Sequence, residues 1–203
     1  IDYALMARIL VDERDSGGYP IWVCGPALVH SRARNDMVWF IQHGFVGALL
    51  AGNAVAVHDI EASIFGTTLG MSGEGKATQG GHGLHMRAIN KVRASGSIAE
   101  AVANGTIKDG IMHACVTTNT PFVLTGSIRD DGPLPEVITD AIAAQAANGA
   151  VSNAAAASTA SGANNRRPRR AQRMGARPAA VAGRPTSVAA DRRRQGAGPG
   201  LSH

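Results

Sequence analysis

The 203-residue sequence is poor in cysteine, in aromatic residues and in long apolar runs. Its two cysteines, Cys24 and Cys115, lie far apart and form no CxxC pair, so we expect two reduced, buried thiols rather than a disulfide. No apolar run approaches the roughly 18 residues that a membrane-spanning helix needs, and the first residues do not resemble a secretory leader. We therefore expect a cytoplasmic protein without a membrane partner.

The last part of the chain lacks acidic and large apolar residues. Residues 1–147 carry 10 Lys and Arg against 14 Asp and Glu, a net charge of −4, whereas residues 148–203 carry 10 Arg against one acid, a net charge of +9. Burying the tail's five large apolar side chains, at about 1.5–3 kcal/mol each, cannot offset about 1–2 kcal/mol of backbone entropy per ordered residue. We therefore predict a folded domain over residues 1–147 and a disordered tail over residues 148–203.

Arginine clusters at residues 166–170 and 192–194 raise the question of nucleic-acid binding. They stand among Ala, Gly and Pro, without aromatic residues between them and without a predicted fold. Such a composition is also what out-of-frame translation of a GC-rich gene would give. We expect no nucleic-acid partner and keep an Arg-tailed nucleic-acid binder as an alternative hypothesis.

The domain alternates apolar strands with segments of helical periodicity. We expect strands over residues 19–24, 46–51 and 121–125, and helices over residues 2–14, 27–43, 53–65, 84–95, 97–104, 107–118 and 135–146. Asn53 is the expected N-cap of its helix, and the Gly-rich residues 66–83 are expected to form a long loop. This order predicts an α/β, Rossmann-like three-layer domain with a mainly parallel sheet and helices on both faces.

Glycine-containing segments follow each of the three expected strands. In parallel sheets ligands bind beyond the carboxyl ends of the strands, where backbone N–H groups at helix N-termini can hold phosphate. Neither GxGxxG nor GxxxxGK[ST] occurs, so the usual phosphate-loop motifs do not support a nucleotide site. The candidate cofactor-binding residues at the strand ends are Gly25, Pro26, Gly52, Asn53, Gly126 and Ser127.

An imidazole and two carboxylates occupy the first turns of the helix that follows the second strand. His58 and Glu61 are three residues apart and share a face, which would suit a proton-relay pair or a carboxylate that binds a ribose. Asp59 lies between them as a further cofactor candidate. The alternative is an ordinary helix start, where the helix dipole favours acids.

Residues 129–131 place a guanidinium beside two acids, directly after the third strand. Arg129, Asp130 and Asp131 would suit an ionic ligand, although an ordinary turn also accepts Asp. His82 and His85 have no carboxylate or cysteine at ligand spacing, so we expect no metal site there.

Three of these segments resemble a known family. The runs LAGNAVAVHDIE (residues 50–61), HMRAIN (residues 85–90) and GSIRDDGPLP (residues 126–135) are similar to the alternative-type ornithine cyclodeaminases, a region also labelled the LOR/SDH bifunctional enzyme conserved region. The same region forms the C-terminal part of cyanobacterial arginine dihydrolase–ornithine cyclodeaminase proteins. The resemblance covers about residues 1–145.

The resemblance implies an NAD-binding domain of an enzyme that converts L-ornithine to L-proline and ammonia. In that reaction a hydride leaves the α-carbon for NAD, ammonia is lost on ring closure, and the hydride returns to the cyclic imine. Arg129 would suit the carboxylate clamp, with Asn90 as a further substrate-binding residue, and Asp130, Asp131 or His58 would suit the base. The resemblance leaves a homo-oligomer open.

The resemblance ends near Gln145, where family members continue with further helix and strand units. We therefore expect a truncated or frameshifted copy, incomplete at both ends. An amino-acid dehydrogenase of the lysine/saccharopine type is the alternative enzyme, and it would differ by accumulating free NADH.

Overall fold

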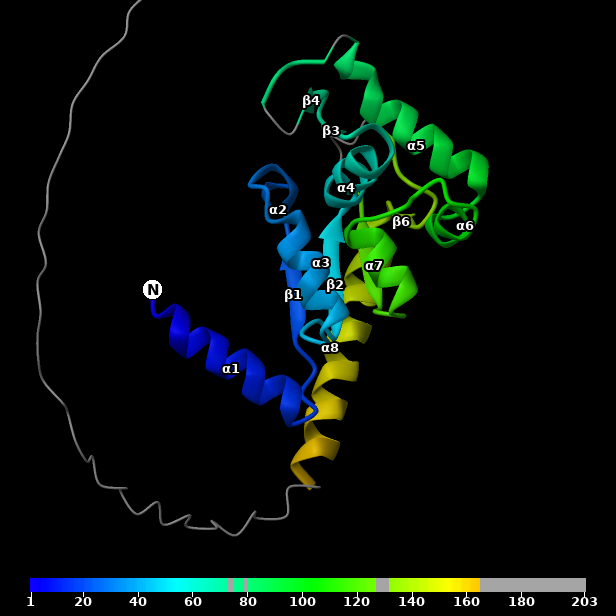
Figure 1. Cartoon of the computed structure of the whole chain (residues 1–203). Helices are drawn as coiled ribbons and strands as arrows, with labels where there is room; N and C mark the ends of the chain where they lie inside the picture. The colour runs from blue at the N-terminus through cyan, green and yellow to red at the C-terminus, as the bar shows by residue number, and fades with distance from the viewer. Residues whose placement is uncertain (73–74, 79, 127–131, 165–203) are drawn as a thin grey trace, which may run out of the picture. The chain divides into compact units, whose positions relative to one another are not determined.

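The computed structural model describes residues 1–72, 75–78, 80–126 and 132–164 (Figure 1). For His82 and residues 159–164 the backbone alone is described. The helices are α1 (Tyr3–Asp15), α2 (Ala27–His30), α3 (Arg34–Gln42), α4 (Asn53–Phe65), η1 (Gly81–Gly83), α5 (Leu84–Ser95), α6 (Ile98–Ala103), α7 (Ile111–Thr117) and α8 (Ala141–Asn164). The strands are β1 (Ile21–Cys24), β2 (Ala48–Gly52), β3 (Thr67–Thr68), β4 (Met71–Ser72), β5 (Phe122–Thr125) and β6 (Val137–Ile138).

Four strands form a parallel sheet in the order β1-β2-β5-β6, which confirms the predicted sheet type. Cys24 pairs with Ala51, and Ala51 with Leu124, so the three strands that the sequence indicated end at one edge. Gly25, Gly52 and Gly126 follow at or beside this edge because the register aligns the strand ends. The carboxyl edge is therefore where a ligand site is expected.

Helices cover both faces of the sheet, as a three-layer α/β fold requires. The apolar core joins sheet residues such as Leu49 and Leu124 to Met37 of α3, Ile60 of α4 and Met112 of α7. In Figure 1, α3 and α7 lie in front of the sheet and α8 lies behind it, where α8 contacts β5 and β6. The predicted Rossmann-like architecture is confirmed.

The two cysteines are unbonded. Burial, together with the nearby Asp59 and Cys24, raises the pKa of the Cys115 thiol to about 12, and burial also raises the pKa of Cys24. Both thiols are therefore neutral at physiological pH. Cys115 is buried as predicted, whereas Cys24 is only half-buried at the end of β1.

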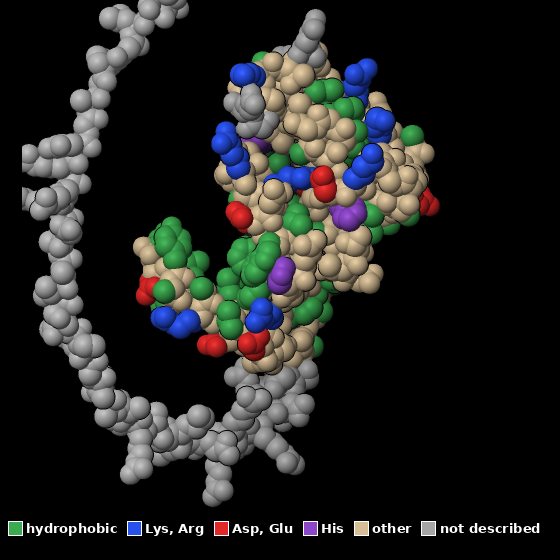
Figure 2. Space-filling view, in the orientation of Figure 1, with side chains coloured by type: hydrophobic (Ala, Val, Ile, Leu, Met, Phe, Trp, Pro, Cys, Tyr) green, Lys and Arg blue, Asp and Glu red, His purple; other side chains and the backbone are tan. Residues whose placement is uncertain are grey.

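Helix α1 contributes no buried residue to the domain. Figure 2 shows apolar side chains gathered on α1 and on the surface that faces it. An apolar groove of about 440 Å³ lies between them, with Trp22, Trp39 and Phe45 on the domain side. The bounds of α1 lie within one residue of the predicted range 2–14, and its apolar side chains line this groove rather than the buried core.

Three predicted elements differ in kind or number from the structure, and α7 begins at Ile111 rather than at the predicted residue 107. The helix expected over residues 27–43 divides into α2 and α3, because Arg32 adopts a left-handed conformation with φ of 68°. The loop expected over residues 66–83 contains the antiparallel β3–β4 hairpin and the short helix η1. The helix expected over residues 135–146 begins later, because Val137 and Ile138 instead add a fourth strand beside β5.

Helix α8 also continues to Asn164, well beyond the predicted end of the domain at residue 147. Its half-buried positions recur at helical spacing, at Ala144, Ala147, Asn148, Val151 and Ala155. Small side chains let this face lie close to the sheet, and the Ala-rich sequence favours a helix. Residues 165–203, the rest of the predicted tail, lie outside the described residues. Among the described residues, no helix is long and apolar enough to cross a bilayer.

Candidate functional site

A pocket of about 220 Å³ lies at the carboxyl edge of the sheet, on the α8 side. It is lined by Val23, Cys24, Leu50, Ala51, Gly52, Thr125 and Asn148. A Cβ atom added to Gly52 would lie 3.9 Å from the carbonyl oxygen of Thr125, so a larger side chain there would enter the space between two strand ends. We call this cavity the strand-end pocket.

Asn53 connects two of the segments that were predicted to converge. Its side-chain amide donates to the carbonyl of Gly132 at 3.0 Å, and its side-chain oxygen accepts from the amide of Leu134 at 3.1 Å. Gly52 rather than Asn53 is the N-cap of α4, so the N-cap prediction is wrong by one residue. The buried Asn53 side chain is instead used to hold the segment before β6 against the end of β2.

The other predicted strand-end residues divide into two groups. Gly25 and Pro26 are exposed directly after β1, and Gly126 donates its amide to the carbonyl of Ile138 at 2.9 Å. Ser127, Arg129, Asp130 and Asp131 lie outside the described residues. The structure therefore brings Gly25, Gly52, Asn53 and Gly126 to one edge, and in the sequence the other four follow Gly126.

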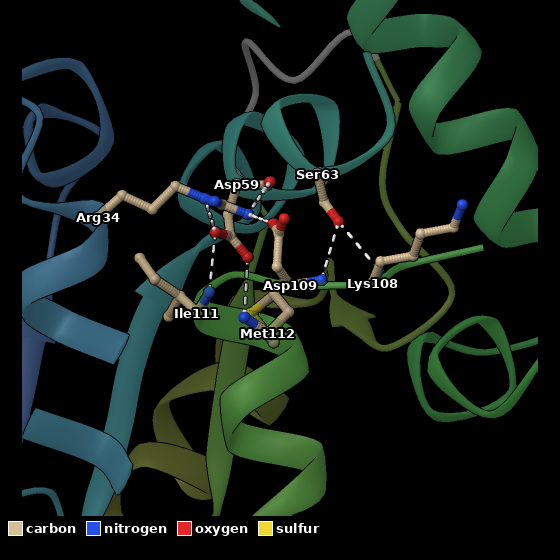
Figure 3. A network of polar contacts seen from close by, with 7 residues as sticks. All are labelled: Arg34, Asp59, Ser63, Lys108, Asp109, Ile111 and Met112. Atoms are coloured by element: carbon tan, nitrogen blue, oxygen red, sulfur yellow. Dashed lines mark hydrogen bonds and ion pairs between the residues drawn. The ribbon is translucent and has the colours of Figure 1, made fainter. Parts of the chain in front are cut away.

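Asp59 lies in the centre of a buried polar network (Figure 3). Its carboxylate accepts from Nε of Arg34 at 2.6 Å and from the amides of Ile111 and Met112 at 2.9 and 2.8 Å. Its side chain is fully buried. These contacts join α3, α4 and the start of α7, and the predicted contact of Asp59 with a cofactor stays a prediction.

Arg34 also binds Asp109, at 2.5 Å from Nη2. Burial alone would lower the pKa of Arg34, but the neighbouring Asp59 and Asp109 outweigh burial and raise it, so the guanidinium stays charged. The hydroxyl of Ser63 accepts from the amides of Lys108 and Asp109 and holds the same loop. The backbone at Gly110 passes so close to Arg34 and Asp59 that a Cβ atom would collide with both.

Glu61 is buried on the opposite side of the helix start and holds the β3–β4 hairpin. Its carboxylate accepts from the hydroxyl of Thr67 at 2.8 Å and from the amides of Leu69 and Gly70 at 3.0 and 2.9 Å. Burial would raise the pKa of Glu61, but these donors and His58 together lower it below its ordinary value. Glu61 is therefore ionised at neutral pH, and its predicted ribose contact stays a prediction.

His58 and Glu61 share a face, as the spacing predicted. Nδ1 of His58 lies 3.9 Å from Oε2 of Glu61, which is an ion-pair distance and longer than a hydrogen bond. The His58 ring is 8% exposed and packs against the ring of His30, with centroids 4.7 Å apart. The sequence did not single out His30, because its proximity to His58 depends on the break between α2 and α3.

Asn90 is exposed on α5, one turn from Met86 and from Arg93. Arg93 donates to the carbonyl of Pro133 at 2.8 Å, so this face of α5 lies beside the segment that follows residues 127–131. Its predicted substrate contact is untested. Among the described residues no three His, Cys, Asp or Glu side chains are grouped as a metal site, and the side chain of His82 is not described.

Over more than half of its length, the chain is similar in sequence and structure to known proteins. The ornithine cyclodeaminase of Methanopyrus kandleri (strain AV19) is 54% identical over 130 residues, which are 64% of this chain and 32% of the relative. A LOR/SDH protein from Methanococcus maripaludis S2 has a solved structure that matches with a TM-score of 0.70 and 40% identity, over 72% of this chain and 47% of that chain. The chain thus spans about a third of the length of the curated relative.

A second similar structure is that of a complex with ligands. The ternary complex of AgrE with ornithine and NAD⁺ matches with a TM-score of 0.69 and 45% identity, over 72% of this chain and 22% of that chain. The family described as arginine dihydrolase ArgZ-like, C-terminal, Rossmann fold matches residues 4–158. The parallel sheet, its glycine-containing strand ends and this match together show that the chain belongs to the ArgZ-like C-terminal Rossmann-fold family.

Proposed function

We propose that this chain is the NAD-binding domain of an ornithine cyclodeaminase, which converts L-ornithine to L-proline and ammonia. The observation that carries the proposal is the likeness to AgrE, at 45% identity and a TM-score of 0.69, because AgrE was solved with both ornithine and NAD⁺. The ornithine cyclodeaminases related to this chain support the same activity.

The carboxyl edge of the sheet is where NAD would bind. Gly25 and Gly52 present backbone without side chains at two strand ends, and the small residues of the strand-end pocket leave room for a flat ring or a ribose. Asn53 fixes the loop before β6 beside them. When bound, NAD supplies a reversible hydride acceptor.

The remaining roles are proposed for His58 and for residues 129–131, which follow β5 in the sequence. Arg129 is the proposed clamp for the ornithine carboxylate, because a guanidinium binds a carboxylate through two parallel hydrogen bonds. Asp130, Asp131 or His58 is the proposed base for the amine. His58 is mostly covered by its surroundings, whereas both acids belong to the segment between β5 and the loop held by Asn53.

The NAD site is tested by filling the strand-end pocket. Gly52→Val should weaken NAD binding by on the order of tenfold or more, because the branched side chain would enter the space beside Thr125. Gly83→Ala is the matched control, since nothing lies within 4 Å of its added Cβ and Gly83 is remote from this pocket's lining. Calorimetric titration of NAD into the full chain measures both, and equal affinity in Gly52→Val and the parent would place the dinucleotide elsewhere.

A further inference from the structure

A second cavity lies between the α2–α3 segment and the β3–β4 hairpin. Its volume is about 410 Å³, and its lining includes His30, Arg32, Arg34, Thr67, Leu69 and Ser72. It shares no lining residue with the strand-end pocket. We call it the hairpin cleft, and in Figure 1 its walls lie beyond the arrowheads of β1 and β2.

Of the two arginines that line the hairpin cleft, Arg34 has acidic partners and Arg32 has none among the described residues. Arg34 is already paired with Asp59 and Asp109. The carboxylate of Glu61, behind the hairpin wall, is fully buried and receives three hydrogen bonds from the hairpin. The amide of Arg32 donates to the carbonyl of Val29. Its side chain makes no hydrogen bond or ion pair with the described residues, so among them the guanidinium has no counter-charge and can meet a ligand.

The backbone at Arg32 adopts a left-handed conformation, which is unfavourable for an arginine. Arg32 has φ of 68° and Leu69, across the cleft, has φ of 50°. The described residues contain one other non-glycine with positive φ, Asn119, and Asn tolerates this conformation better than Arg or Leu. Such strain is concentrated at ligand sites, where a side chain is needed at a position that glycine would otherwise occupy.

Hydroxyl groups and apolar surface complete the cleft. Thr68 and Ser72 bring two hydroxyls to its hairpin wall, while the hydroxyl of Thr67 already donates to Glu61. The Ser72 hydroxyl oxygen accepts from the amide of Lys76 at 3.2 Å, which leaves its hydrogen free to donate. Val29, Ala62 and Met71 supply apolar surface. A guanidinium beside hydroxyl donors favours an oxyanion, and the apolar wall suits a short carbon skeleton attached to it.

We propose that the hairpin cleft binds the oxyanion group of a small metabolite, a carboxylate or a phosphate, through Arg32. This site goes beyond the proposed NAD site, and its existence does not depend on the cyclodeaminase activity. The buried Glu61 positions the hairpin wall, and the turn at residues 31–33 presents the guanidinium from the other side.

The test is a titration of the ¹⁵N-labelled full chain, followed by amide chemical shifts at constant ionic strength. The probes are inorganic phosphate, acetate and L-proline, in parallel samples of the parent, Arg32→Gly, Arg32→Lys and Asn119→Gly. Arg32→Gly should fold well, because glycine accepts a positive φ. Asn119→Gly is the matched control, since it relieves the same kind of backbone strain away from the cleft lining.

We expect saturable shifts at residues 67–72 of the parent, with the dissociation constant raised at least tenfold in Arg32→Gly, several-fold in Arg32→Lys and unchanged in Asn119→Gly. A preference for phosphate identifies a phosphate ligand, and a preference for acetate or L-proline identifies a carboxylate. Shifts confined to the arginine-rich tail, or the same dissociation constant in the parent and Arg32→Gly, would overturn the proposal. NAD binding is measured separately, so failure here leaves the strand-end site standing.

Discussion

Two acidic residues share one arginine in this domain, and their different burial predicts different effects on stability. The side chain of Asp59 is fully buried and that of Asp109 is 63% exposed, although both bind Arg34. Removing one partner of a buried pair leaves an uncompensated charge in the interior, whereas exposed pairs are screened by water. Burial, rather than the number of ion pairs, should therefore decide the cost.

We expect Asp59→Asn to lower the free energy of unfolding by about 3 kcal/mol, because Arg34 loses its buried counter-charge. The matched substitution Asp109→Asn should cost less than about 1 kcal/mol. Urea titrations of both variants give the comparison directly. Equal costs would show that the network in Figure 3 is not the support for α7 that its geometry indicates.

The sequence indicated which residues of α4 are special but not which task each performs. The residues 58–61 are predicted to meet a ligand, which stays a prediction, and the structure adds that Asp59 and Glu61 accept hydrogen bonds from α7 and from the hairpin. Those donors lie far away in the chain or in a segment expected to be a loop, so no local pattern identified them. Arg34, the partner of Asp59, gave no signal for the same reason.

At the scale of elements, the β3–β4 hairpin depends on a single carboxylate. Because the folded-state pKa of Glu61 is lowered from 4.5, its contribution to stability is present above about pH 4.5 and is lost as the pH falls through the lower folded value. The turn that Glu61 holds contains the positive φ of Leu69 and of Gly70, so its loss should release the hairpin before the core.

We expect Glu61→Gln to destabilise the protein by about 1–3 kcal/mol, since the amide nitrogen cannot accept from the hairpin. Amide hydrogen exchange should speed up most at Leu69 and Gly70. Exchange in the core helix α7 serves as the internal control. Unchanged protection at Leu69 and Gly70 would contradict the assigned role of Glu61.

The positions of helices and strands are predicted well where the hydrophobic pattern is strong. They are predicted poorly where a contact with a distant part of the chain determines the local structure. The strands β1, β2 and β5 and the helices α4, α5 and α6 lie close to their expected ranges. The division between α2 and α3 was missed because no Gly or Pro marks it, and Arg32 adopts the left-handed conformation instead. Val137 and Ile138 form a strand because they pair with the edge of β5. A two-residue segment is too short for its own sequence pattern to predict a strand.

At the scale of the whole molecule, the predicted and the observed end of the folded domain differ. Composition predicts a domain that ends at residue 147, whereas α8 runs to Asn164 and presents half-buried positions beyond Asn148. The Ala-rich sequence of α8 has no stripe of large apolar residues, so composition did not predict that it packs. A helix face of small residues can nevertheless pack closely on a sheet.

Two truncations of the chain decide between these boundaries. Ending the chain after Asn164 should leave the thermal midpoint unchanged, while ending it after Ala147 should lower the midpoint by several degrees, because Asn148 and most of α8 are removed. Thermal unfolding followed by circular dichroism measures both. Equal midpoints would restore the boundary predicted from composition.

The proposed function requires an enzyme that returns to its product the hydride it removed from its substrate. The most direct measurement uses L-ornithine deuterated at the α-carbon, incubated with NAD and a whole ornithine cyclodeaminase in which this chain replaces the corresponding domain, followed by mass spectrometry of the amino acids and absorbance of NADH. The account predicts proline that retains the deuterium at its α-carbon, with no accumulation of reduced cofactor. Accumulating NADH, proline without the label, or no proline at saturating NAD would contradict it.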